Sequence, residues 1–134
     1  MEKKIRVLAV DDQQCILELL KQILEDEGFA VTVAADGESG IALLEEIKPD
    51  VVLLDIRMPG LDGYQVLERI RKVSDVPVLM LTGVREENAL VHSFDIGAND
   101  YICKPFATNL LIARIRAKLR RARGDLHQDN NQAA

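Results

Sequence analysis

The chain has 134 residues, of which 48% are hydrophobic and 29% are charged, and its formal net charge is −5. This length suits one globular domain that buries roughly two-thirds of its unfolded surface, and the composition argues against a disordered chain. No apolar run approaches the ~18 residues of a membrane span, and the N-terminus lacks a signal peptide. We therefore expect a cytoplasmic protein without a membrane partner. Its two cysteines are too few for a disulfide framework and are expected to be reduced.

The charge is distributed unevenly. Residues 114–123 contain six basic side chains and no acid, which leaves 11 basic against 22 acidic residues elsewhere. A general nucleic-acid binder needs a broader basic surface, so direct nucleic-acid binding by this domain is not expected.

Apolar periodicity predicts strands and helices in strict alternation. Short Val, Leu and Ile runs indicate buried strands, and spacings of three and four residues indicate amphipathic helices, the first of which is expected to end at Gly28 as its C-cap. In chain order, the predicted elements are strand 5–10, helix 16–24, strand 30–34, helix 38–47, strand 51–54, helix 64–72, strand 78–81, helix 86–96, strand 100–103 and helix 108–123.

This alternation predicts an α/β fold. Short connections and right-handed crossovers give a single-domain (βα)5 flavodoxin-like three-layer sandwich, with a parallel five-stranded sheet in the order 2-1-3-4-5. The domain is expected to cover residues 1–123. Residues 124–134 are polar and are expected to form a tail or the stub of a linker.

Polar side chains follow the predicted strands at the edge where ligands bind in such sheets. Asp11 and Asp12 follow the first strand, and Asp55, Thr82 and Lys104 follow the third, fourth and fifth strands. Each alone is an ordinary cap, turn or surface residue. Together they predict a site with three carboxylates, a hydroxyl and an ammonium.

The predicted carboxylates need compensating charge. Two of them ~4 Å apart repel by roughly 1 to 4 kcal/mol at effective dielectric constants of 80 to 20. Lys104 supplies one positive charge, and Mg²⁺ bound by oxygen ligands supplies two more. Such a site suits phosphoryl transfer to a carboxylate. The sequence has no dinucleotide or P-loop phosphate motif, no paired His or Cys ligands and no Ser-His-Asp elbow.

Four ordered motifs resemble a known family. The segments VLAVDD, VVLLDIRMPGLDGYQVL, LMLTG and DYICKPF are similar to the signatures of the receiver domain of two-component response regulators, of the CheY-like superfamily. The resemblance extends from about residue 5 to residue 121, which is nearly the whole chain.

The resemblance implies a role for each matching acidic residue. Asp55 corresponds to the phosphoacceptor and also belongs to the metal site. Asp12 corresponds to the direct Mg²⁺ ligand, Asp11 assists through metal-bound water, and the backbone carbonyl of Arg57 is a further ligand.

The resemblance also implies how the phosphoryl group is bound and sensed. Thr82 corresponds to the hydroxyl that bonds the phosphoryl group, and Lys104 to the ammonium that pairs with it. Tyr101 corresponds to an aromatic switch that turns inward after the threonine moves. The peptide bond between Lys104 and Pro105 is expected to be cis.

These roles describe a phosphorylation-switched signalling domain rather than a turnover enzyme, with only self-phosphorylation and autodephosphorylation as its own reactions. A sensor histidine kinase or a phosphotransfer protein is the expected phosphodonor. The expected output surface consists of helix 86–96, strand 100–103 and helix 108–123. Its use is left open by the sequence: a homodimer, regulation of transcription through a missing C-terminal effector domain, a stand-alone receiver and a receiver from a hybrid kinase all fit.

Two alternative functions fit parts of the pattern. One is an unphosphorylated pseudo-receiver that serves only as an interaction module, against which the complete set of site residues argues. The other is a haloacid-dehalogenase-like phosphatase, which needs a second aspartate where this chain has Arg57.

On the output surface, Leu90 and Leu110 stand where the resembling subfamily of DNA-binding regulators often pairs a basic residue of the fourth helix with an acidic residue of the fifth across a dimer. They either pack inward or add an exposed apolar contact.

Overall fold

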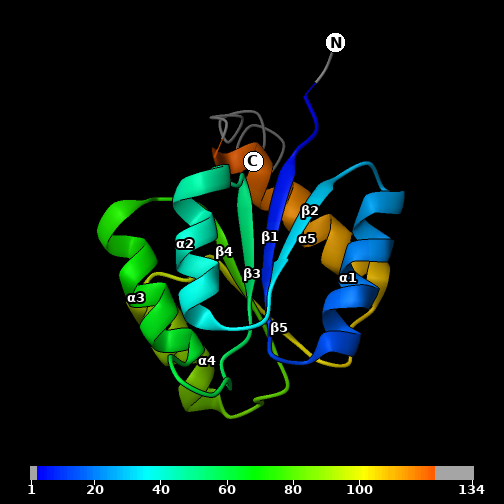
Figure 1. Ribbon diagram of the computed structural model, residues 1–134. Helices are drawn as coiled ribbons and strands as arrows, with labels where there is room; N and C mark the ends of the chain where they lie inside the picture. Colours follow the sequence, from blue (N-terminus) through cyan, green and yellow to red (C-terminus); the bar gives the residue numbers. More distant parts are fainter. Residues whose placement is uncertain (1–2, 123–134) are drawn as a thin grey trace, which may run out of the picture.

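The computed structural model describes residues 3–122 and confirms the alternation of strands and helices (Figure 1). The elements are β1 Arg6–Val10, α1 Gln14–Asp26, β2 Ala30–Ala34, α2 Gly37–Ile47, β3 Val51–Leu54, α3 Gly63–Val73, β4 Val78–Thr82, α4 Glu87–Ile96, β5 Asp100–Cys103 and α5 Thr108–Ala122. Their ends differ from the predicted ones by a residue or two. The predicted domain boundary at 123/124 and the tail lie outside the described residues.

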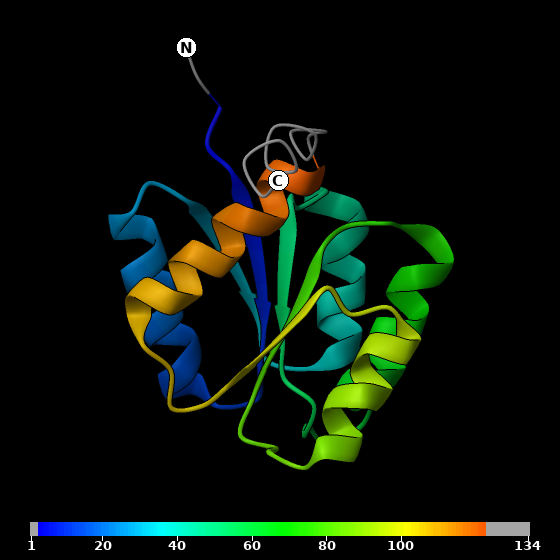
Figure 2. The ribbon, with the colours of Figure 1, turned by 180° about the vertical axis from the view of Figure 1, so that it is seen from behind.

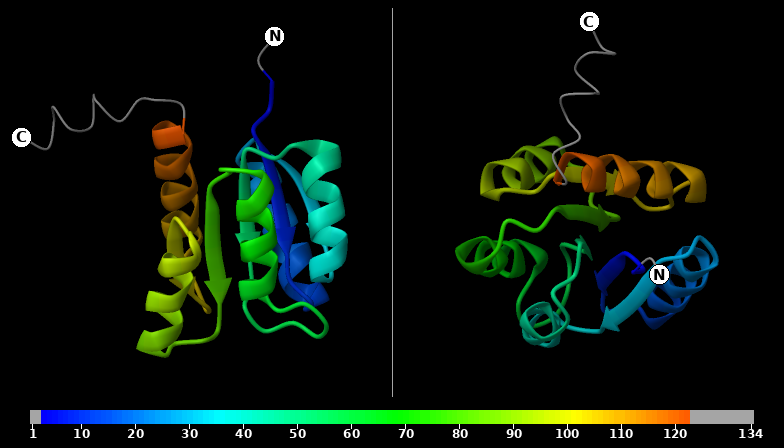
Figure 3. Two further views of the ribbon diagram at one scale, coloured as in Figure 1. Left: turned by 90° about the vertical axis from the view of Figure 1, so that its left-hand side faces the viewer. Right: turned by 90° about the horizontal axis from the view of Figure 1, so that it is seen from above.

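The five strands form one parallel sheet in the predicted order β2-β1-β3-β4-β5. Helices α2, α3 and α4 cover one face of the sheet, and α1 and α5 cover the other (Figures 2 and 3). The flavodoxin-like three-layer sandwich is therefore confirmed. None of the helices between residues 3 and 122 is long and apolar enough to cross a bilayer.

The core explains why the strands read as continuous apolar runs. In β1, Leu8 and Val10 pack toward α2, α3 and α4, whereas Val7 and Ala9 pack toward α1 and α5. Both faces of the strand are covered after Arg6, so the four residues from Val7 to Val10 are all apolar and buried. Polar side chains begin where this two-sided cover ends, at the carboxyl edge of the sheet.

Local capping sets the helix ends. Asp62 and Gln65 form a capping box at the start of α3, in which each side chain accepts a hydrogen bond from the other's backbone N–H at 2.9 Å. One expectation is corrected at α1. Its C-cap is Glu27, and Gly28 follows with φ +94°, so the glycine supplies the left-handed turn just beyond the cap.

Gly63 brings the first turn of α3 against the end of β3. Its backbone N–H donates to the Ile56 carbonyl at 2.7 Å. A Cβ atom at this position would collide with the backbone carbonyl of Asp55. The close approach therefore requires glycine and fixes the backbone that carries Asp55.

Helix α4 is held unequally at its two ends. Its buried side chains are only Ala89 and Ser93, and its N-cap, Glu86, makes no side-chain capping bond. At the other end, the guanidinium of Arg71 in α3 donates to the Gly97 carbonyl at 2.9 Å and to the side chain of Asn99 at 2.8 Å. Arg71 also donates to the carbonyls of residues 74 and 76 in the loop before β4. The C-terminal end of α4 is thus fastened to α3.

Three large apolar residues of α4 face solvent: Leu90, Val91 and Phe94. Leu110 of α5 is exposed as well. Of the two possible orientations of Leu90 and Leu110, the structure has the exposed one, with 39% and 43% of their surface accessible.

Candidate functional site

The three predicted carboxylates meet at the carboxyl edge of the sheet. Asp11 and Asp55 follow the paired strand ends Val10 and Leu54, and the Asp55 N–H donates to the Val10 carbonyl at 3.1 Å. One oxygen from each of Asp11, Asp12 and Asp55 lies within 4.8 Å of the others. Asp11 and Asp55 are buried, whereas Asp12 is exposed to solvent.

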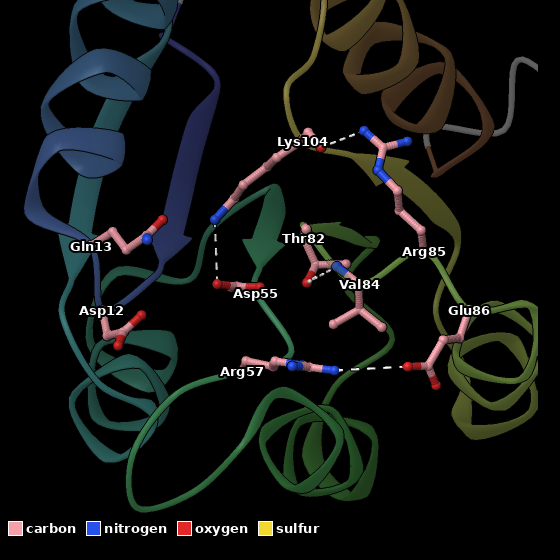
Figure 4. Close-up of a pocket in the computed structure, with 10 residues that line it drawn as sticks. Asp12, Gln13, Asp55, Arg57, Thr82, Val84, Arg85, Glu86 and Lys104 are labelled. Carbon is pink, nitrogen blue, oxygen red and sulfur yellow. Dashed lines mark hydrogen bonds and ion pairs between the residues drawn. The ribbon is translucent and has the colours of Figure 1, made fainter.

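Lys104 neutralises the buried part of this cluster. Its Nζ lies 3.3 Å from Asp55 Oδ2 (Figure 4). It also lies 2.6 Å from Asp11 Oδ2, and only 13% of the lysine side chain is accessible. Burial raises the pKa of Asp11 above its usual value, and the bonds from Lys104 and from the Gln13 N–H partly oppose that rise. The ammonium therefore lies where it can contact a group bound to Asp55.

Thr82 is the last residue of β4 and is fully buried. Its hydroxyl accepts a hydrogen bond from the Val84 N–H at 3.3 Å, and its carbonyl accepts one from the Lys104 N–H at 2.8 Å. The peptide bond between Lys104 and Pro105 is cis, as the resemblance implied.

Tyr101 occupies the inward position. Its ring is buried against α4 and its hydroxyl donates to the Val84 carbonyl at 2.5 Å. Burial raises the pKa of this phenol to about 12. The inward ring coexists here with a Thr82 hydroxyl that is bonded to the Val84 N–H.

A pocket of about 640 Å³ opens above Asp55. Its lining includes Asp12, Thr82 and Lys104, and the side chains of Arg57 and Glu86 face each other across it (Figure 4). Their charged atoms are 3.9 Å apart, and both side chains are about three-quarters exposed. The role of the Arg57 backbone carbonyl as a metal ligand stays a prediction.

Sequence reasoning missed one contact at this site. Arg85, in the loop between β4 and α4, donates from Nη2 to the carbonyl of Lys104 at 2.7 Å. No local sequence pattern predicts this bond, because its two loops are far apart in the chain and lie side by side only in the folded structure.

The donor set fits a hard divalent cation such as Mg²⁺, because all three clustered side chains offer carboxylate oxygens. A cation there would offset repulsion that Lys104 alone leaves uncompensated. The hydroxyl and the ammonium beside the cluster add groups that can bind phosphoryl oxygens.

Comparisons with known proteins agree with this architecture. The sequence model of the response regulator receiver domain matches residues 7–116. The probable transcriptional regulator ycf27 of Guillardia theta is 47% identical over 121 residues, which cover 90% of this chain and 48% of that protein. The chain therefore spans about half the length of this curated relative.

Solved structures give the same result. A CheY-like receiver domain protein from Methanospirillum hungatei JF-1 is 34% identical, with a TM-score of 0.87, over 92% of this chain and 99% of that one. The BeF3-activated N-terminal receiver domain of Klebsiella pneumoniae RstA is 31% identical, with a TM-score of 0.83, over 86% of this chain and 98% of that one. The fold, the strand-end site and these matches together establish that the chain belongs to the family of response regulator receiver domains of two-component systems.

Proposed function

We propose that Asp55 accepts a phosphoryl group from the phosphohistidine of a sensor histidine kinase or a phosphotransfer protein in the cytoplasm. The observation that carries the proposal is the position of the Lys104 ammonium, which contacts both Asp11 and Asp55 at the edge of an open pocket. Asp55 is the carboxylate of this group that follows the central strand β3 and lines the pocket.

The transfer needs only Asp55, the phosphohistidine and a proton from solvent. A carboxylate oxygen of Asp55 bonds to phosphorus while the P–N bond of phosphohistidine breaks. The electron pair of that bond stays on the imidazole nitrogen, which takes a proton from solvent. The product is an acyl phosphate whose oxygens lie within reach of the Lys104 ammonium and the Thr82 hydroxyl. We propose that the same groups serve self-phosphorylation and autodephosphorylation and that these are the only reactions of the domain itself.

Mg²⁺ is the proposed cofactor, held by Asp11, Asp12, Asp55 and the backbone carbonyl of Arg57. When bound, it supplies positive charge that neutralises phosphoryl oxygens. Asp12 suits direct contact with a hydrated cation because its carboxylate is exposed and makes no hydrogen bond among the described residues, whereas Asp11 is engaged by Lys104 and Gln13.

The proposed readout runs from Thr82 and Tyr101 to the surface of α4, β5 and α5. Thr82 bonds the N–H of Val84 and Tyr101 bonds the carbonyl of the same residue, so a movement of Thr82 toward the phosphoryl group alters the loop that the tyrosine contacts. Homodimerisation through this surface would exploit the exposed Leu90 and Leu110. Because ycf27 carries the name of a transcriptional regulator, we further propose an output in transcription through an effector domain beyond this segment.

Acetyl phosphate with Mg²⁺ tests the proposal, because the site carries its own catalytic groups. Intact-mass spectrometry should find one added phosphoryl group on the parent chain and none on Asp55→Asn. Labelling of that variant at the parent's level would move the acceptor elsewhere. A parent that stays unlabelled with both small donors and phosphohistidine would favour the pseudo-receiver. A haloacid-dehalogenase-like phosphatase is disfavoured by Arg57, which stands where that reaction needs an acid.

A further inference from the structure

We propose that Arg85 is a positioning residue for phosphoryl acceptance, because it holds the backbone of Lys104. The inference rests on the proposed function of Asp55. Its basis is the hydrogen bond of 2.7 Å from Arg85 Nη2 to the Lys104 carbonyl, which connects the loop after β4 to the loop after β5 (Figure 4).

With this bond, both backbone polar groups of Lys104 are engaged. Its N–H donates to the Thr82 carbonyl at 2.8 Å, and its carbonyl accepts from Arg85. The lysine stem has four flexible carbons, so the position of the ammonium depends on how firmly its root is held. Groups that contact a reacting phosphoryl must be positioned closely, since displacement by about 1 Å can cost large factors in rate.

Arg85 acts through Lys104 rather than on the carboxylates. Its one hydrogen bond among residues 3–122 is the bond to the Lys104 carbonyl, and it forms no ion pair there with Asp11 or Asp55. Because the bond joins Arg85 to the backbone of Lys104 and to neither carboxylate, its loss acts on the position of that lysine. The expected effect is therefore a local one.

The same loop is fastened to β5 by Tyr101. Arg85 directly follows Val84, whose carbonyl accepts the Tyr101 hydroxyl. Inward Tyr101 and bonded Arg85 thus stabilise one loop position together. Coupling between two binding equilibria is reciprocal, so a partner that fixes Tyr101 inward should also hold the backbone of Lys104 more firmly.

Arg85→Met keeps most of the apolar stem but removes the donors, and Arg85→Lys restores one donor. Arg120→Met is the matched control, because Arg120 is an exposed arginine near the far end of α5. We would follow Asp55 labelling by acetyl phosphate with Mg²⁺. Arg85→Met should lower the maximal rate about fivefold, the factor expected for one lost hydrogen bond, with little change in the donor concentration at half-maximal rate. Arg85→Lys should recover part of the rate, and Arg120→Met should match the parent.

Salt and NMR separate positioning from long-range attraction of an anionic donor. The Arg85→Met defect should persist at high salt, where attraction from exposed charges is screened. In the unphosphorylated protein, the ¹³C signal of the Lys104 carbonyl and the ¹⁵N signal of its Nζ should shift in Arg85→Met and stay unchanged in Arg120→Met. In Arg85→Met combined with Tyr101→Phe, the rate loss should be smaller than the product of the single losses.

The inference is overturned if Arg85→Met is labelled at the parent rate, if its defect disappears at high salt, or if the Lys104 signals do not move. A parent that is not labelled would count against the proposed function alone. The Lys104 signals would then decide whether Arg85 positions that residue.

Discussion

Replacing Asp12 with alanine should raise the melting temperature of the metal-free protein. The Asp12 side chain is exposed and makes no hydrogen bond among the described residues, so its removal breaks no hydrogen bond. Its carboxylate oxygen lies within 4.8 Å of oxygens of Asp11 and Asp55, and this proximity is unfavourable while all three are ionised. The substitution removes two repulsive pairs.

The size of the effect follows from those distances. One pair of unit charges 4.8 Å apart repels by about 0.9 kcal/mol at a dielectric constant of about 80 and by about 3.5 kcal/mol at about 20. Asp12 is open to water, so the lower value applies, and attraction to Lys104 offsets part of it. The net gain in unfolding free energy should be about 1 kcal/mol, which corresponds to roughly 4 °C for a domain of this size.

Calorimetric melts at low salt with a chelator measure this gain. Asp11→Ala should melt lower than the parent, because it loses the hydrogen bonds from Lys104 and from the Gln13 N–H. Glu18→Ala, which removes an exposed acid of α1 that forms no ion pair among the described residues, controls for net charge. It should leave the melting temperature nearly unchanged.

Saturating Mg²⁺ should reverse the order. The cation should stabilise the parent more than Asp12→Ala, since binding to the native state adds a free energy of RT ln(1 + [L]/Kd), which is larger for the site with the lower Kd. The reasoning is refuted if Asp12→Ala melts lower than the parent in chelator, or if Glu18→Ala gains as much. High salt should shrink the gain.

Three further outcomes are expected. The phenol of Tyr101 has a pKa of about 12 in the folded state against about 10 when unfolded. Its contribution to the free energy of unfolding is therefore complete below pH ~10 and is lost as the pH rises toward ~12. Urea unfolding across this pH range should show that the parent loses on the order of 2 kcal/mol of unfolding free energy and that Tyr101→Phe does not. An equal dependence of unfolding free energy on pH in the two proteins would refute this. Gly63→Ala should cost about 2 kcal/mol or more, because the new Cβ meets backbone, whereas Gly83→Ala, with open space around it, should be nearly neutral in the same measurement. The beryllofluoride form should self-associate in sedimentation experiments at high salt, and Leu90→Lys or Leu110→Lys should abolish this association. The reason is that a buried leucine contributes about 2 kcal/mol, against ~0 to 1 kcal/mol for an exposed ion pair. Association that survives both substitutions together would exclude this surface.

Strand ends were predictable because their cause is local. Each apolar run stops where two-sided cover stops, so the sequence alone places Asp11 and Asp55 at one edge of the sheet. These features depend on neighbours along the chain or on the sheet order.

Contacts between loops could not be predicted in this way. Arg85 and Glu86 are adjacent in sequence, yet one reaches the loop after β5 and the other faces Arg57 in the loop after β3. Which way each side chain extends depends on the path of both partner loops. The orientation of Leu90 was equally open, because α4 has apolar residues around much of its circumference and its buried residues are the small Ala89 and Ser93.

Because Arg71 holds the C-terminal end of α4 at Gly97, a tilt of this helix would move mainly its N-terminal end. Ten residues at 1.5 Å each give a length of about 15 Å, so a tilt of about 10° around Gly97 would displace the Glu86 end by roughly 2.6 Å. Leu90 lies nearer the moving end and Phe94 nearer the fixed one. A partner bound to the exposed apolar residues of this helix would therefore meet a graded displacement, larger at Leu90 than at Phe94 and close to zero at Gly97.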